Sequence, residues 1–171
     1  HGAAGPRPAP EATLPGAVPR ILLIGGTEPV PDEDLRNLYT AVVEIGRAEG
    51  YEVFFKDHPI HSMGFACKSC AVIDPALPME LVTEHFAFSV GVASTAIFGV
   101  GDRKLSIMNL LELPKAVRQV RRERLLSHPD SDPGRLEFVA DLAALGSILR
   151  AARGAGHRDE PTDELADGRR L

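Results

Sequence analysis

The stretch RILLIGG, residues 20–26, decides the fold. Four apolar residues, from Ile21 to Ile24, follow one another without interruption and stop at two glycines. Such a run is typical of a parallel strand covered on both faces, because a half-exposed strand would alternate apolar and polar residues. Residues 32–49 follow with apolar side chains at helical spacing, and Gly50 stands where that helix would end. The stretch therefore predicts the first strand and helix of a parallel α/β domain.

The same alternation continues along the chain. We expect further strands at residues 51–55, 70–73, 86–90 and 105–108, and helices at residues 78–84, 94–99, 114–127 and 136–153. Alternating strands and helices imply right-handed crossovers and one parallel sheet, so we predict a three-layer, Rossmann-like α/β domain over residues 20–153. Residues 1–19, rich in Pro and Ala, are predicted to be a linker or disordered arm, and residues 154–171 a disordered tail.

The composition restricts the function. A chain of 171 residues is about one domain long. A net charge of −5 disfavours non-specific nucleic-acid binding, and no stretch approaches the roughly 20 apolar residues of a membrane span. Two cysteines, Cys67 and Cys70, cannot build the disulfide framework of a small secreted protein, and the first 20 residues lack a secretory signal pattern. We therefore expect a cytoplasmic protein without an integral membrane segment.

Polar residues follow the second predicted strand in the sequence FFKDHP, residues 54–59. Lys56 and His58 are two residues apart, so an extended chain directs both side chains to one face and Asp57 to the other. Lysine supplies a compact charge and histidine a donor that titrates near neutrality, a combination suited to a phosphate that becomes a leaving group. Pro59 keeps His58 extended. Taken alone, such a short motif is more often part of an ordinary surface loop.

Two further motifs follow later strands. In SVGVASTA, residues 89–96, Gly91 permits a close turn, and Ser94 and Thr95 stand at a predicted helix start, where free N–H groups favour an anion. In PMEL, residues 78–81, the proline places Glu80 in a first helical turn, where a carboxylate can accept hydrogen bonds from ribose hydroxyls. Each motif has a simpler explanation, since Ser and Thr cap many helices and Glu favours first turns.

The order and spacing of these motifs are more specific than any one of them. K-x-H-P after one strand, P-x-E-L some 20 residues later and G-x-x-S-T-A after the next strand resemble the nucleotide-binding half of bacterial GT-B sialyltransferases, most closely the polysialyltransferase-like family. The resemblance covers about residues 20–108. Two positions depart from the family pattern: Asp57 replaces a small or cyclic residue, and Ala93 stands where a first serine is common.

The resemblance implies a fold equivalent to the C-terminal half of a GT-B enzyme, and transfer of sialic acid from CMP-sialic acid to a glycan hydroxyl. It assigns the donor phosphate to Lys56 and His58, the nucleotide sugar to Glu80, and further phosphate contacts to Ser94 and Thr95. Pro59 and Gly91 shape the same binding site, and His58 is the catalytic residue. No metal or other cofactor is implied. The acceptor domain would lie N-terminal to this half, so we expect an incomplete enzyme, a split one with a separate acceptor-domain chain, or a degenerate relative.

Three other interpretations compete. Cys67 and Cys70 form a C-x-x-C near His58 and His61, which suggests a zinc or redox site, although no second ligand pair follows. The basic run RQVRRER, residues 118–124, is compatible with peripheral attachment at the inner membrane face or with a solvated helix face. Finally, the chain can be a non-catalytic Rossmann-like module that binds a nucleotide or a partner.

Overall fold

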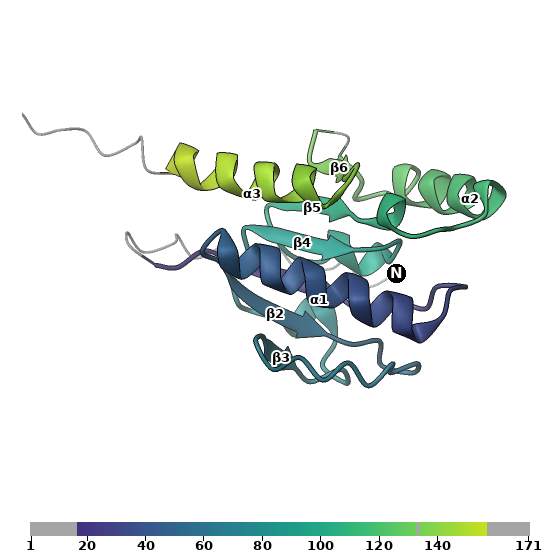
Figure 1. Cartoon of the computed structure of the whole chain (residues 1–171), viewed down its shortest axis with the longest axis horizontal. Helices are drawn as coiled ribbons and strands as arrows, with labels where there is room; N and C mark the ends of the chain where they lie inside the picture. The colour runs from purple at the N-terminus through teal and green to yellow at the C-terminus, as the bar shows by residue number, and fades with distance from the viewer. Residues whose placement is uncertain (1–16, 133, 157–171) are drawn as a thin grey trace, which may run out of the picture.

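A computed structural model describes residues 17–132 and 134–156. In this region six parallel strands form one sheet in the order β3-β2-β1-β4-β5-β6 (Figure 1). The strands are β1 (Arg20–Ile24), β2 (Glu52–Lys56), β3 (Ala71–Ile73), β4 (Phe88–Gly91), β5 (Arg103–Ser106) and β6 (Leu136–Phe138). The three-layer, Rossmann-like α/β prediction is confirmed. The order along the sheet reverses between β1 and β4, which is the topological switch point where ligands of such folds bind.

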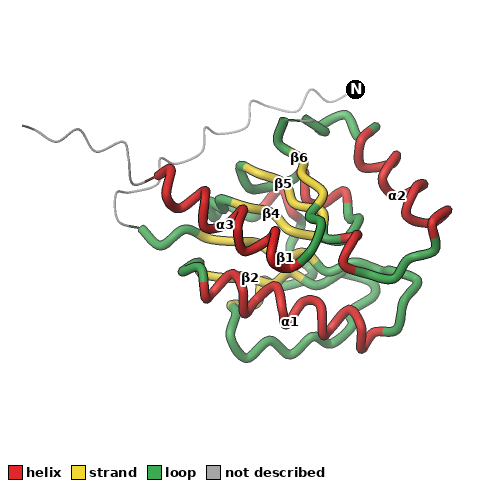
Figure 2. Tube along the Cα trace, turned by 45° about the horizontal axis from the view of Figure 1, so that its top comes forward, coloured by secondary structure: helices red, strands yellow, loops and turns green. Residues whose placement is uncertain are grey.

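Helices α1 (Asp32–Ala48) and α3 (Leu142–Gly156) lie side by side on one face of the sheet, as Figures 1 and 2 show. Short 3-10 helices η1 (Met79–Leu81) and η2 (Thr95–Phe98) follow β3 and β4, and η3 (Met108–Leu110) follows β5. Helix α2 (Lys115–Leu126) lies at the end of the molecule where the strands finish.

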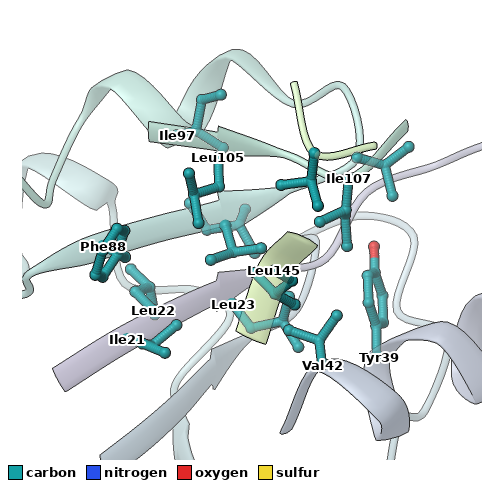
Figure 3. Packing of buried hydrophobic residues seen from close by; sticks show 14 of the residues in the cluster. Ile21, Leu22, Leu23, Tyr39, Val42, Phe88, Ile97, Leu105, Ile107 and Leu145 are labelled. Atoms are coloured by element: carbon teal, nitrogen blue, oxygen red, sulfur yellow. The ribbon is translucent and has the colours of Figure 1, made fainter. Parts of the chain in front are cut away.

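The core confirms that β1 is a fully covered strand. Its residues Ile21, Leu22 and Leu23 are at most 1% exposed. Figure 3 shows these side chains packed with Val42 of α1, Leu145 of α3 and side chains from β4, β5 and η2. By the usual area arithmetic, burying each of the three contributes about 1.5–3 kcal/mol. This packed core holds the strands whose ends carry the loops of the candidate site.

The predicted helix over residues 136–153 was wrong at its start. Residues Leu136–Phe138 form β6 beside β5, and the helix begins at Leu142. The helix start is capped by Asp141, whose Oδ1 accepts a hydrogen bond from the Ala144 N–H at 2.7 Å. Leu136 of β6 and Val139 just after it are buried. The helical spacing of apolar residues cannot predict this burial, because it depends on the pairing of β6 with β5.

The other predicted elements are present with shifted bounds. The helices expected at residues 78–84 and 94–99 are single 3-10 turns, and the strand expected at 105–108 begins at Arg103 and ends at Ser106. Residues 154–156, predicted as part of the tail, belong to α3. The predicted arm lies mostly outside the described residues, and so does the rest of the predicted tail.

Candidate functional site at the carboxyl edge of the sheet

The K-x-H-P and G-x-x-S-T-A motifs follow strands that end at the same level of the sheet. Ile24 of β1 is in register with Lys56 of β2 on one side and with Gly91 of β4 on the other. Because neighbouring strands lie about 4.8 Å apart, Lys56 and Gly91 are separated by roughly 10 Å across the end of β1. The loops that carry His58 and Ser94 therefore flank the switch point.

Lys56 is used inside the protein. Its side chain is buried, and Nζ donates to the carbonyl oxygens of Pro75 at 2.8 Å and Asp74 at 3.4 Å. Burial lowers the pKa of Lys56, while the charges of Asp74 and Asp57 oppose this effect. Lys56 therefore holds the chain that leads from β3 to η1, which is the segment with Glu80.

His58 is half-buried, and its Nε2 makes no hydrogen bond within the part of the chain that the structure describes. Its Nδ1 accepts hydrogen bonds from the backbone N–H groups of Ile60 and His61, both at 3.2 Å, and Pro59 lies exposed inside this turn. These donors need an unprotonated Nδ1, so the tautomer they select carries its proton on Nε2. The His61 ring stacks on His58 with centroids 5.5 Å apart. His58 can therefore donate one hydrogen bond, from Nε2, to a ligand.

Asp57 stabilises this loop rather than pairing with Lys56. Its carboxylate is buried and accepts from the His58 N–H at 2.8 Å and from Ser62 Oγ at 2.6 Å. A Cβ at Gly25 would lie 2.8 Å from Asp57 Oδ1, so only glycine permits this close approach of the β1 and β2 loops. The departure of Asp57 from the family pattern is thus a local support for His58.

The β4 loop is held by buried hydroxyls. Ser89 Oγ donates to the Ile97 carbonyl and Ser106 Oγ to the Val92 carbonyl, both at 2.6 Å. Gly91 lets η2 fold back, because a Cβ there would lie 2.9 Å from Ile97 Cγ2. Ser94 Oγ accepts from the Ala96 N–H at 3.3 Å and caps η2, whereas the hydroxyl of the half-buried Thr95 makes no hydrogen bond within residues 17–132 and 134–156.

Glu80 is exposed on η1. A Cβ at Gly99 would lie 3.3 Å from Met79 Cβ, so η1 packs against the end of η2. The structure thus brings together η1, which carries Glu80, and η2, which carries Thr95. The loop with His58 follows β2, on the other side of β1 from β4.

Sequence reasoning missed a second polar group at the same edge. Glu28 lies in the loop that follows β1, residues 25–31, which we call the β1 loop. Its Oε2 is 3.1 Å from Nε of Arg121 on α2, and its side chain is 2% exposed. Burial raises the pKa of Glu28 to about 7, although the Arg121 charge lowers it. The sequence signal was the position of Glu28 just after Gly25 and Gly26, but its partner is 93 residues away.

A groove of about 1140 Å³ lies beside this edge, between the β1 loop, α1 and the start of α3. It is not lined by Lys56, His58, Glu80, Ser94 or Thr95. Its described lining includes Asp34, Glu112 and Asp141 and no basic residue, so its charge disfavours an anionic nucleotide.

The cysteines and two arginines of the basic run make contacts within the protein. Cys67 and Cys70 form a disulfide just before β3, whereas disulfides are uncommon in the reducing cytoplasm that the sequence led us to expect. Within residues 17–132 and 134–156, no group of three His, Cys, Asp or Glu residues is arranged to hold a metal ion. In the basic run, Arg118 donates to the carbonyls of Leu111 and Leu113, and Arg122 lies 4.1 Å from the centroid of the Phe138 ring.

Comparison of the chain with protein-family models and with curated proteins finds no match. In the described part of the chain, no helix has the length and apolar character needed to cross a membrane.

Proposed function

We propose that this chain is the donor-binding half of a sialyltransferase-like glycosyltransferase and holds a CMP-activated acidic sugar at the carboxyl edge of its sheet. The observation that carries the proposal is the register of Lys56, Ile24 and Gly91, which puts the K-x-H-P and G-x-x-S-T loops on either side of the switch point. That edge is where ligands of open parallel sheets bind.

In the proposed reaction the bond between the sugar's anomeric carbon and the CMP phosphate oxygen breaks. The acceptor hydroxyl oxygen bonds to that carbon and loses its proton to a base on an acceptor-binding domain, and CMP leaves with the bonding electrons. The His58 Nε2–H donates to the phosphate oxygen on which charge develops. A preorganised donor aimed at such charge lowers the barrier.

The remaining residues have supporting roles in this proposal. Thr95 offers a hydroxyl to the phosphate, and Glu80 accepts from the sugar or ribose hydroxyls of the donor. Lys56 acts mainly as a positioning residue, because its ammonium already binds two carbonyl oxygens. No metal ion has a part in the proposed reaction, and transfer requires an acceptor domain in addition to these residues.

The test is isothermal titration calorimetry of CMP, UDP and GDP with wild type, His58→Asn and His58→Gln. Asparagine can keep an acceptor near the Nδ1 position and so preserve the turn, whereas glutamine can place an amide N–H near the Nε2 position. We expect selective CMP binding, a loss of about 10-fold or more in His58→Asn, and partial recovery in His58→Gln, since hydrogen bonds to charged groups are worth about 1.5–3 kcal/mol.

The matched control is His61→Asn, which changes the neighbouring exposed imidazole and keeps the backbone N–H that binds His58. It should bind CMP within about 2-fold of wild type, because the proposal gives the His61 side chain no contact with the donor and His58 keeps both hydrogen bonds to its Nδ1. Equal affinity for the three nucleotides, or unchanged CMP affinity in His58→Asn, would remove the donor-site proposal.

A second candidate is a nucleotide-binding module without turnover. The occupied Lys56 ammonium favours it, because a catalytic site would gain from a free cation next to the departing phosphate. The two candidates separate in an assay of CMP release from CMP-sialic acid. Binding of CMP without any release, in the presence of simple glycan acceptors, would favour the module.

A further inference from the structure

Helix α2 connects two loops of the proposed site. Arg121 Nη2 donates to the Thr27 carbonyl in the β1 loop at 3.3 Å, and the His128 ring just after the helix stacks on Phe98 of η2 with centroids 4.7 Å apart. Leu125 between them is fully buried. In Figures 1 and 2 the helix lies beyond the ends of the strands. A ligand between the β1 and β4 loops would therefore lie beside α2.

The β1 loop also links Arg121 to His58. A Cβ at Gly25 would lie 3.3 Å from the His58 backbone nitrogen, so the His58 loop packs on this turn. Two residues later, Thr27 accepts from Arg121. The turn at residues 25–27 therefore lies between His58, the predicted hydrogen-bond donor to phosphate, and the guanidinium of Arg121.

The ion pair that holds Arg121 is incomplete. Glu28 Oε2 is buried and, although 3.1 Å from Arg121 Nε, makes no hydrogen bond of normal geometry within the described residues. The buried hydroxyl of Tyr39 on α1 lies near the backbone of Gly26 and likewise makes no hydrogen bond of normal geometry there. When a buried carboxylate has poor hydrogen bonds, the free energy of its desolvation can exceed that of its attraction to one cation. The Arg121 side chain, in contrast, is 26% exposed and can reach solvent.

We propose that Arg121 is a second anion-binding residue of the donor site and that Glu28 is its internal competitor. When an anion binds at the turn of residues 25–27, the Arg121 guanidinium moves from Glu28 to the anion. Glu28 then takes up one proton from solvent. Guanidinium suits this exchange because it binds phosphate and carboxylate with the same fork of N–H donors. This inference rests on the proposed function for the position of the anion.

A pH dependence follows from the groups that face Glu28. These are Arg121 from α2, Tyr39 from α1 and, next to Tyr39, Asp57 at the end of β2. Below about pH 7 Glu28 is protonated and no longer competes for Arg121, whereas above it the carboxylate does. Anion affinity should therefore rise as the pH falls from 8 to 6.

The first test measures binding of the methyl ester of cytidine 5′-phosphate, a diester whose charge is constant between pH 6 and 8. We compare wild type, Glu28→Gln and Arg121→Gln at both pH values, with Glu49→Gln as control, since Glu49 forms an Arg pair with Arg150 away from this edge. Relative to wild type, Glu28→Gln should bind several-fold more tightly at pH 8 and about equally at pH 6. Arg121→Gln should bind about 10-fold more weakly at pH 6, the loss of one charged hydrogen bond, and Glu49→Gln should follow wild type.

The second test keeps the native chain. The Nε–H signal of Arg121, assigned by its loss in Arg121→Gln, is followed by NMR while the diester or inorganic phosphate is added. We expect a shift of this signal and none for Arg150. Diester binding that needs His58 but leaves the Arg121 signal and both variants unchanged overturns this inference alone. A shift with inorganic phosphate but no nucleotide binding overturns the proposed function alone, and no response to either probe overturns both.

Discussion

Lys56 has the predicted position, but its ammonium has hydrogen-bond partners that the sequence did not indicate. It ends β2 at the carboxyl edge, as expected, but its ammonium donates to the Asp74 and Pro75 carbonyls. These partners are 18 and 19 residues away in the chain. A strand end can be predicted from an apolar run, whereas the loop that folds over it depends on the whole sheet. The same limit hid the pair of Glu28 and Arg121.

The substitution Lys56→Met tests this positioning role. Methionine keeps most of the buried volume but leaves the two carbonyls without their donor, so we expect a loss of about 1–3 kcal/mol in the free energy of unfolding. Lys68→Met, at an exposed position between the cysteines, is the control and should change it by less than about 0.5 kcal/mol. Urea denaturation measures both. Equal effects would mean that Lys56 has no special structural role.

At the scale of elements, the sequence predicted the strands and helices that a local apolar run or periodicity marks. The strand from Ile21 to Ile24 and the helix over residues 32–49 were predicted within about one residue of their observed bounds. The start of α3 was wrong, because Leu136, Phe138 and Val139 fit a helical spacing that runs directly into Leu142. Pairing of β6 with β5 is a tertiary effect, and it outweighs that local preference.

Two glycines in the paired helices give opposite predictions. A Cβ at Gly46 of α1 would lie 2.9 Å from Val53 Cγ2 and 3.2 Å from Ile21 Cδ1, whereas one at Gly146 of α3 meets nothing closer than 3.7 Å. We expect Gly46→Ala to lower the free energy of unfolding by about 1–3 kcal/mol through overpacking. Gly146→Ala should raise it by about 0.5–1 kcal/mol, because alanine favours the helix.

Thermal and urea denaturation of both variants measures these changes, and each variant serves as the other's control. A stable Gly46→Ala protein would contradict the close contact between α1 and β1–β2. Destabilisation by Gly146→Ala would contradict the looser packing of α3 against α1.

For the whole molecule, the sheet order matters more than any single motif. The reversal between β1 and β4 gathers the loops after β1, β2 and β4 at one edge. The opposite edge is fixed by structural contacts: Tyr51 Oη donates to the Leu149 carbonyl at 2.8 Å, and Arg150 binds Glu49. The domain therefore has one edge with polar groups available to a ligand and one edge used to fasten α3.

This division predicts where a nucleotide changes hydrogen exchange. Saturating CMP should slow exchange in residues 25–28, 57–62 and 92–97, because bound ligand suppresses local opening of the loops it touches. Residues 49–51 and 101–102, in loops at the opposite edge, should exchange as in the free protein. The measurement is exchange followed by mass spectrometry, with UDP as the matched nucleotide. Protection confined to the opposite edge, or identical protection by UDP, would contradict a cytidylate site at the carboxyl ends of the strands, and the assignment of His58 would be lost with it.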